Sequence, residues 1–208
     1  MTTRILIADD HEMVRTCLRT LLGDAGWEVA GEAANGEQAV SLALSTKPCI
    51  ALIDYQMPIM NGLEAARNIR TKLPTTEVAL FTMHDDLVVV ARAFEAGARG
   101  YLTKTEINDH LLSAVEALAS HRPYLSERTT TRLAHSSEAG MNKVFAVHPC
   151  GDRVDGYTPG EGVGFQLLRD QMADEQIAAL LGVEVELIGQ LRSRLSTYER
   201  CSGGKAPH

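Results

Sequence analysis

Carboxylate, hydroxyl and ammonium side chains follow directly after short apolar runs in the first half of the chain. These side chains are Asp9, Asp10, Asp54, Thr82 and Lys104. Such runs are typical of strands buried on both faces, and open α/β sheets bind ligands at the carboxyl ends of their strands. If the strands are parallel, three carboxylates crowd at one edge and repel one another unless a hard cation such as Mg²⁺ neutralises them. We therefore expect a Mg²⁺ site for a phosphoryl group, whose oxygens would contact the metal, the hydroxyl and the ammonium.

The residues around these side chains alternate between strand and helix patterns. The expected strands are Arg4–Ala8, Trp27–Ala33, Ile50–Ile53, Glu77–Phe81 and Gly100–Thr103. The expected helices are His11–Leu22, Gly36–Ser45, Leu63–Leu73, Asp85–Ala96 and Ile107–Ala119. A fivefold alternation of strand and helix predicts the α/β class, with a five-stranded, doubly wound parallel sheet that helices cover on both faces.

The same residues, in the same order, resemble the receiver domain of two-component response regulators. The residues that carry the resemblance are Asp9, Asp10, Asp54, Met57-Pro58, Asn61-Gly62, Thr82, Gly100-Tyr101 and Lys104. The strings Ile7–His11 and Phe81–Asp86 are similar in particular to the NarL/FixJ branch, whose members usually carry a C-terminal helix-turn-helix. The resemblance implies that residues 1–120 form a flavodoxin-like receiver domain.

The resemblance assigns a role to each carboxylate. Asp54 is expected to accept a phosphoryl group from a sensor histidine kinase. Asp10 and Asp54 are expected to bind Mg²⁺ directly. Asp9 is expected to bind the metal through a water molecule, and Gln56 through its backbone carbonyl oxygen.

The resemblance also implies a phosphorylation switch. Lys104 is expected to stabilise the phosphoryl oxygens, and Thr82 to move towards the new phosphate. The space that Thr82 leaves is expected to let Tyr101 turn inward as a rotamer switch. The resulting change in shape would favour a homodimer or release the C-terminal domain.

The composition changes after residue 120. Residues 121–156 are expected to be a linker, with a short helix at Thr129–Leu133 and a flexible stretch at Ser136–Gly140. Residues 157–200 resemble the LuxR-type helix-turn-helix domain, a small all-α domain. Its expected elements are a helix that Thr158-Pro159 opens, the helix Glu175–Leu181, a turn after Gly182 and the recognition helix Val185–Leu195.

This C-terminal domain departs from the family pattern. Glycines alternate with other residues at the start of its first helix, and each costs about 1 kcal/mol against alanine. Glu184 and Glu186 stand in the recognition region, where carboxylates weaken binding to phosphates. The side chains that remain as DNA contacts are Gln190, Arg192, Ser193 and Arg194. Two functions stay open, with the first favoured: a DNA-binding transcription regulator, and a phosphorylation-controlled interaction protein that no longer binds DNA.

Composition and charge restrict the class of protein further. The 208 residues are 45% hydrophobic, which excludes wholesale disorder, and carry a formal charge of −7. Residues 121–208 contain 10 basic and 11 acidic residues, so the second half is not basic as a DNA-binding module normally is. No apolar run approaches the roughly 18 residues of a membrane span. Met1–Arg4 leads straight into a strand pattern without a secretory signal, so we expect a cytoplasmic protein.

Two other chemistries are not expected from the residues present. The four cysteines, Cys17, Cys49, Cys150 and Cys201, form neither a CxxC pair nor a zinc-binding spacing. The seven histidines share no spacing, and we interpret them as surface residues. A phosphatase of the haloacid dehalogenase type also uses an Asp at a strand end, but requires a second Asp two residues later, where Gln56 stands. We therefore expect a regulator and not an enzyme.

Overall fold

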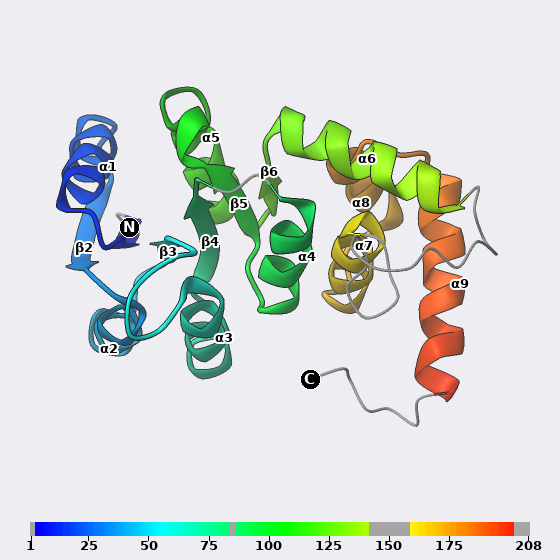
Figure 1. Ribbon diagram of the computed structural model, residues 1–208, viewed down its shortest axis with the longest axis horizontal. Coiled ribbons are helices and arrows are strands. Elements are labelled where there is room, and N and C mark those ends of the chain that lie inside the picture. Colours follow the sequence, from blue (N-terminus) through cyan, green and yellow to red (C-terminus); the bar gives the residue numbers. More distant parts are fainter. Residues whose placement is uncertain (1–2, 84–85, 142–158, 202–208) are drawn as a thin grey trace. The chain divides into compact units, whose positions relative to one another are not determined.

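The computed structural model describes residues 3–83, 86–141 and 159–201. The chain divides into two compact units. The first contains all the described strands together with α1, α2, α3 and α5, and the second contains α4 and α6 to α9 (Figure 1).

The first unit is built on one parallel sheet. Its strands are β1 (Arg4–Ala8), β2 (Glu28–Ala33), β3 (Ile50–Ile53), β4 (Glu77–Thr82), β5 (Gly100–Thr103) and β6 (Tyr124–Leu125). They lie in the order β2-β1-β3-β4-β5-β6, and every neighbouring pair is parallel. The α/β class and the doubly wound parallel sheet are confirmed. The strand order reverses between β1 and β3, which is the point where such sheets bind ligands.

The predicted number of five strands was wrong, because β6 adds a sixth. Tyr124 and Leu125 pair with Gly100 and Tyr101, and the Tyr124 N–H donates to the carbonyl oxygen of Arg99 at 2.8 Å. A strand of two residues is too short to produce an alternating hydrophobic pattern, so the sequence contained no periodic signal for it.

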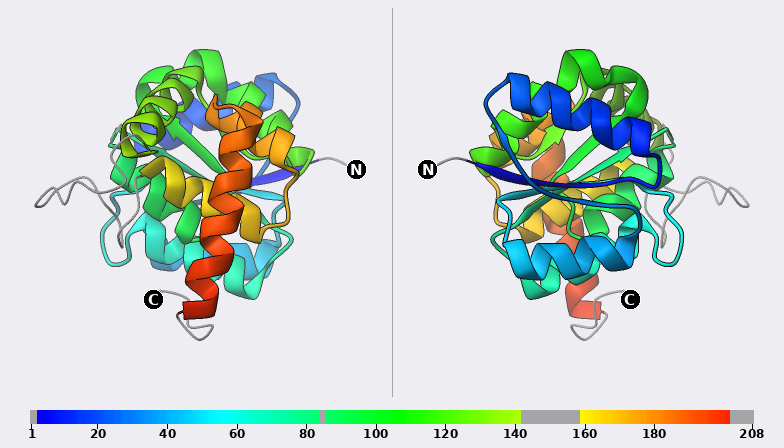
Figure 2. Two further views of the ribbon diagram at one scale, coloured as in Figure 1. Left: turned by 90° about the vertical axis from the view of Figure 1, so that its right-hand side faces the viewer. Right: turned by 90° about the vertical axis from the view of Figure 1, so that its left-hand side faces the viewer.

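Four helices of the first unit cover the two faces of the sheet. α1 (Glu12–Asp24) and α5 (Ile107–Ala119) lie on one face, and α2 (Gly36–Thr46) and α3 (Gly62–Lys72) lie on the other (Figures 1 and 2). A single 3₁₀ turn, η1 (Lys104–Glu106), joins β5 to α5.

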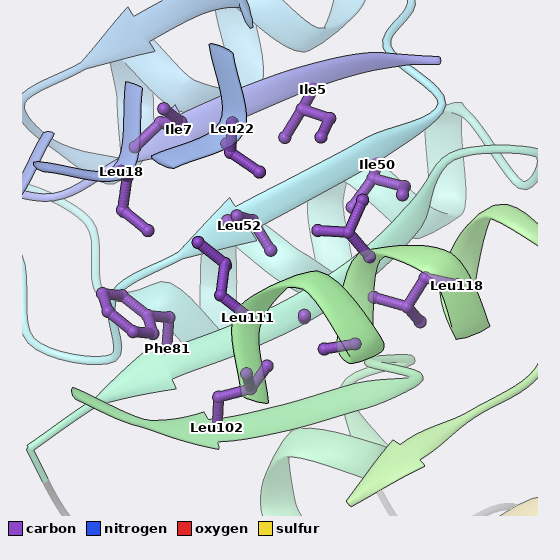
Figure 3. Close-up of a cluster of buried hydrophobic side chains, with 13 residues drawn as sticks. Ile5, Ile7, Leu18, Leu22, Ile50, Leu52, Phe81, Leu102, Leu111 and Leu118 are labelled. Carbon is purple, nitrogen blue, oxygen red and sulfur yellow. The ribbon is translucent and has the colours of Figure 1, made fainter. Parts of the chain in front are cut away.

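A cluster of buried side chains joins α1 and α5 to the sheet. Figure 3 shows Leu18 and Leu22 of α1 and Leu111 of α5 against isoleucine and leucine side chains of β1 and β3. These residues are no more than 1% exposed. Full burial of a side chain of this size contributes about 1.5–3 kcal/mol, so the cluster holds α1 and α5 firmly on this face of the sheet.

The second unit is helical. Its helices are α4 (Leu87–Glu95), α6 (Glu127–Met141), α7 (Pro159–Arg169), α8 (Asp174–Leu181) and α9 (Val185–Cys201). α8 ends at Gly182, which has a left-handed φ of 65°, and α9 begins three residues later. The predicted helices Glu175–Leu181 and Val185–Leu195, and the turn after Gly182, are therefore present. No helix in the described ranges is long and apolar enough to cross a membrane.

Helix α6 occupies part of the segment that was predicted to be a linker. The stretch Ser136–Gly140 was expected to be flexible but lies inside α6. Contacts with α8 hold the part of α6 that precedes this stretch, because Leu133 is fully buried and the Thr130 hydroxyl donates to the carbonyl oxygen of Leu180 at 3.1 Å. Residues 142–156 of the predicted linker lie outside the described residues.

Helix α7 forms in spite of its glycines. A Cβ atom on Gly164 would lie 3.1 Å from Leu191 and 3.4 Å from Leu181. Glycine therefore lets α7 pack closely against α8 and α9, and this packing offsets the low helix propensity that the sequence indicated.

Substitution of Gly62 should destabilise the first unit. A Cβ atom there would lie 2.1 Å from the backbone oxygen of Asp54, so Gly62→Ala must displace the backbone beside the candidate site. We expect a loss of about 1–3 kcal/mol or more in the free energy of unfolding, measured by urea denaturation and circular dichroism. Gly23→Ala is the control, because no atom lies within 4 Å of its Cβ position, and it should be neutral or stabilising by up to about 1 kcal/mol. Equal losses in both variants would contradict this account.

Candidate functional site

Two neighbouring strands, β1 and β3, are each followed by a buried carboxylate. Asp9 follows β1 and is fully buried, and Asp54 follows β3 and is 4% exposed. The Asp9 N–H donates to the carbonyl oxygen of Ala33 at 3.0 Å, and the Asp54 N–H donates to that of Ala8 at 2.8 Å. These bonds continue the sheet pairing past the strand ends, so both carboxylates are held at the point where the strand order reverses.

Lys104 brings these two carboxylates together. Its Nζ atom lies 2.5 Å from Oδ2 of Asp9 and 3.0 Å from Oδ2 of Asp54. The side chain is only 10% exposed, and its Nζ atom lies 5.7 Å from the centre of the Phe81 ring. A buried ammonium between two buried carboxylates leaves one net negative charge before Asp10 is counted.

Burial raises the pKa of Asp54 above its ordinary value. The hydrogen bond and the charge of Lys104 act in the opposite direction, the charge of Asp9 raises the pKa further, and a backbone hydrogen bond from Gln56 lowers it. The ionised form of Asp54 is thus held against a desolvation penalty, and any additional cation at the site would favour it.

His11 extends the acidic cluster. Its Nδ1 lies 2.6 Å from Oδ1 of Asp10 and 3.4 Å from Oδ1 of Asp9, and its backbone N–H donates to Oδ1 of Asp9 at 2.9 Å. Asp9, Asp10 and His11 each offer an atom that could bind a metal, all within 4.8 Å of one another. The His11 side chain is 69% exposed, in agreement with its interpretation as a surface residue, and its position directly after two carboxylates was the signal that it could join them.

Thr82 and Tyr101 lie on β4 and β5, the next two strands after β3 in the sheet. Thr82 ends β4 and is 1% exposed, and it pairs with Thr103 of β5. Tyr101 of β5 pairs with Leu80 and is fully buried.

The loop after Asp54 has an unusual backbone. Ile59 has a φ of 70°, the left-handed region that a β-branched residue rarely adopts, and its side chain is 78% exposed. The Gly62 N–H donates to the carbonyl oxygen of Tyr55 at 2.9 Å, and the Met60 N–H donates to the carbonyl oxygen of Pro58 at 2.8 Å. These bonds hold the loop on both sides of Ile59 and so fix the peptide that follows Gln56.

The four predicted DNA contacts lie on the exposed side of α9. Gln190, Arg192, Ser193 and Arg194 are all exposed, whereas the buried side of the helix carries Ile188, Leu191 and Leu195. Both arginines, however, form ion pairs within the second unit.

Each arginine pairs with a carboxylate of a neighbouring helix. Arg192 pairs with Asp174 at the start of α8, and this hydrogen bond raises the pKa of Arg192. Arg194 pairs with Glu161 of α7, whose side chain is 4% exposed. The partners are 18 and 33 residues apart in the sequence, so no local pattern indicated them.

Comparison with known proteins places these features in one family. Residues 5–116 match the family described as the response regulator receiver domain. The nitrate/nitrite response regulator protein NarL of Escherichia coli (strain K12) is 35% identical over 180 residues, which are 86% of this chain and 81% of that protein.

Solved structures of response regulators also match this chain. A two-component response regulator of the LuxR family from Aurantimonas sp. SI85-9A1 matches with a TM-score of 0.62 and 36% identity, over 65% of this chain and 97% of that one. A structure of two RcsB dimers bound to two parallel DNAs matches with a TM-score of 0.61 over 93% of this chain and 90% of that one. The latter is 19% identical and shows the fold alone.

Replacement of Asp54 by Asn tests the cost of burying this carboxylate. Because burial raises the pKa of Asp54 in the folded chain above 3.8, the ionised carboxylate destabilises the fold at neutral pH. In EDTA, Asp54→Asn should raise the free energy of unfolding at pH 7 by on the order of 1 kcal/mol, as measured by urea denaturation. The gain should shrink as the pH falls through the folded pKa, because the wild-type carboxyl then becomes neutral.

The matched control for this prediction is Asp24→Asn. Asp24 is exposed at the end of α1, and its substitution should leave the free energy of unfolding within about 0.5 kcal/mol of the wild type. A loss of stability in Asp54→Asn at pH 7 would show that the contact with Lys104 outweighs the cost of burial.

Proposed function

This chain belongs to the response regulators that carry a receiver domain, and we propose that it is switched by phosphorylation of Asp54. Its LuxR-family homologues are transcription regulators, and the chain is accordingly a regulator and not an enzyme. The observation that carries the proposal is the contact of Lys104 with Asp9 and Asp54 at the edge where the strand order reverses.

The donor set fits Mg²⁺. Asp9, Asp10 and Asp54 offer carboxylate oxygens, and we propose the backbone carbonyl of Gln56 as a further hard ligand. We propose Asp10 and Asp54 as direct ligands and Asp9 as a ligand through water. When bound, the ion would offset the repulsion between these carboxylates and attract the oxygens of a phosphoryl group.

Asp54 is the proposed nucleophile. A histidine kinase would present a phosphohistidine, and a carboxylate oxygen of Asp54 would attack its phosphorus atom, so that a P–O bond forms as the P–N bond breaks. Lys104 already contacts Oδ2 of Asp54 and would stabilise the phosphoryl oxygens. The buried hydroxyl of Thr82 at the end of β4 would donate a hydrogen bond to one of them.

Tyr101 is proposed to report this change. Its side chain is fully buried, and its strand pairs with β4, which ends on Thr82. The proposed switch is therefore an exchange between this buried position and an outward one, which Thr82 controls from the adjacent strand. Phosphorylation would shift the populations of the two positions and favour a homodimer.

The proposed output is DNA binding through α9. α8, the left-handed Gly182 and α9 support this function, as does the similarity to transcription regulators. Two observations favour the alternative of an interaction protein. Residues 157–200 contain seven acidic and four basic residues, and Arg192 and Arg194 already pair with carboxylates. We therefore expect weak DNA binding that depends on activation.

Phosphorylation is tested with acetyl phosphate. Incubation of the full chain with Mg²⁺ and acetyl phosphate should produce one slower band on a phosphate-affinity gel, and Asp54→Ala should produce none.

Retention of genomic DNA fragments is then measured with and without beryllofluoride at low and moderate salt. Activation-dependent retention that falls steeply with salt supports the transcription regulator. Absence of retention in either state, with a change in oligomeric state, would replace it by the interaction protein.

The ion pair of Arg192 gives a sharper prediction for the same assay. Asp174→Asn should release Arg192 for a phosphate, so that DNA retention increases and the slope of log K against log salt steepens by about 0.9. Glu175→Gln removes the same charge one residue away but leaves the Arg192–Asp174 pair, so it should increase retention less and keep the wild-type slope. Identical behaviour of the two variants would show that only net charge matters.

A further inference from the structure

Arg15 of α1 contacts the backbone of the acidic loop. Its Nη1 donates to the carbonyl oxygen of Asp9 at 2.8 Å, and its Nε lies 3.5 Å from Oε2 of Glu32. The side chain is 16% exposed, so the guanidinium is largely enclosed between the ends of β1 and β2. This contact is separate from the side-chain contacts that Lys104 makes with the site.

Glu32 fixes the guanidinium of Arg15 from the other side. Glu32 lies near the end of β2 and also pairs with Arg19, one helical turn further along α1. The Asp9 N–H is at the same time bonded to Ala33, the last residue of β2. The peptide after Asp9 is therefore held by α1 and β2 together.

The orientation of this peptide determines where Asp10 points. The carbonyl oxygen of Asp9 belongs to the peptide group that joins Asp9 to Asp10, and Arg15 limits the rotation of that group. The Asp10 side chain is 35% exposed and forms an ion pair with His11. Because a metal site requires its ligand oxygens in a defined geometry, a contact that fixes the backbone of a ligand increases metal affinity without touching the metal.

We propose that Arg15 is a positioning residue for the divalent cation site, acting through the backbone carbonyl of Asp9. The inference rests on the proposed function, since it assumes that Asp9, Asp10 and Asp54 bind a cation. Positioning and simple electrostatics predict opposite results. Removal of a positive charge near a cation site strengthens cation binding by electrostatics alone, whereas loss of the positioning contact weakens it.

The test measures metal affinity directly. Mn²⁺, which prefers the same oxygen ligands as Mg²⁺, is titrated into the full-length chain and free ion is followed by electron paramagnetic resonance. Arg15→Met should raise the dissociation constant about tenfold. Arg19→Met is the matched control, because it removes the same charge and a partner of Glu32 but leaves the contact between Arg15 and Asp9. It should bind Mn²⁺ as tightly as the wild type or slightly more tightly.

A second variant covers the case in which Arg15→Met does not fold, as judged by circular dichroism. Arg15→Lys keeps the charge but cannot contact Asp9 and Glu32 with the same planar group, so its dissociation constant should lie between those of wild type and Arg15→Met. Wild-type affinity in both Arg15 variants, or tighter binding in Arg15→Met, would overturn the inference. Failure of the wild type itself to bind Mn²⁺ would instead reject the proposed metal site.

Discussion

Repulsion between two buried carboxylates is the constraint on which the rest of this structure depends. Asp9 and Asp54 follow adjacent parallel strands, so the sheet that positions them also brings their charges together. Lys104, from the end of β5, lies within 3.0 Å of both carboxylates and offsets part of this repulsion. The remaining negative charge favours the binding of a cation, and the burial that makes the charge costly also strengthens each electrostatic contact. The arrangement of strand ends that builds the sheet is therefore the same one that brings the charged groups of the site together.

Local patterns were sufficient to predict most of the first unit. A strand such as β3 is a continuous apolar run because helices cover both faces of the sheet, and Asp54 interrupts that run where the strand ends. Asn35 and Asn61 stand directly before α2 and α3, and a side-chain oxygen of each accepts a backbone N–H bond from the first turn of its helix. The residues that follow the strands could be predicted as one group without any distance, because the carboxyl ends of parallel strands lie at the same edge of a sheet.

The features that the sequence did not reveal depend on contacts between distant segments. β6 is two residues long and exists only beside β5. α6 is rich in Ser and Thr and is held by contacts with α8, which its own composition does not indicate. Arg15 stands in an ordinary amphipathic helix, and only the return of β2 brings Glu32 beside it. In each case tertiary packing outweighs local propensity, so a prediction from local pattern fails.

The ion pair between Arg194 and Glu161 affects how mutational data on the second unit should be interpreted. Glu161 is almost fully buried, so an alanine at position 194 would remove a cation beside a carboxylate that has little contact with water. The helices α7 and α9 would then lose an ion pair that stabilises the domain whether or not DNA is bound. In an alanine scan scored by DNA binding, Arg194 would register as a contact residue even if it never touched a phosphate. Exposure on α9 is therefore not sufficient to distinguish a residue that reads DNA from one that holds the domain together.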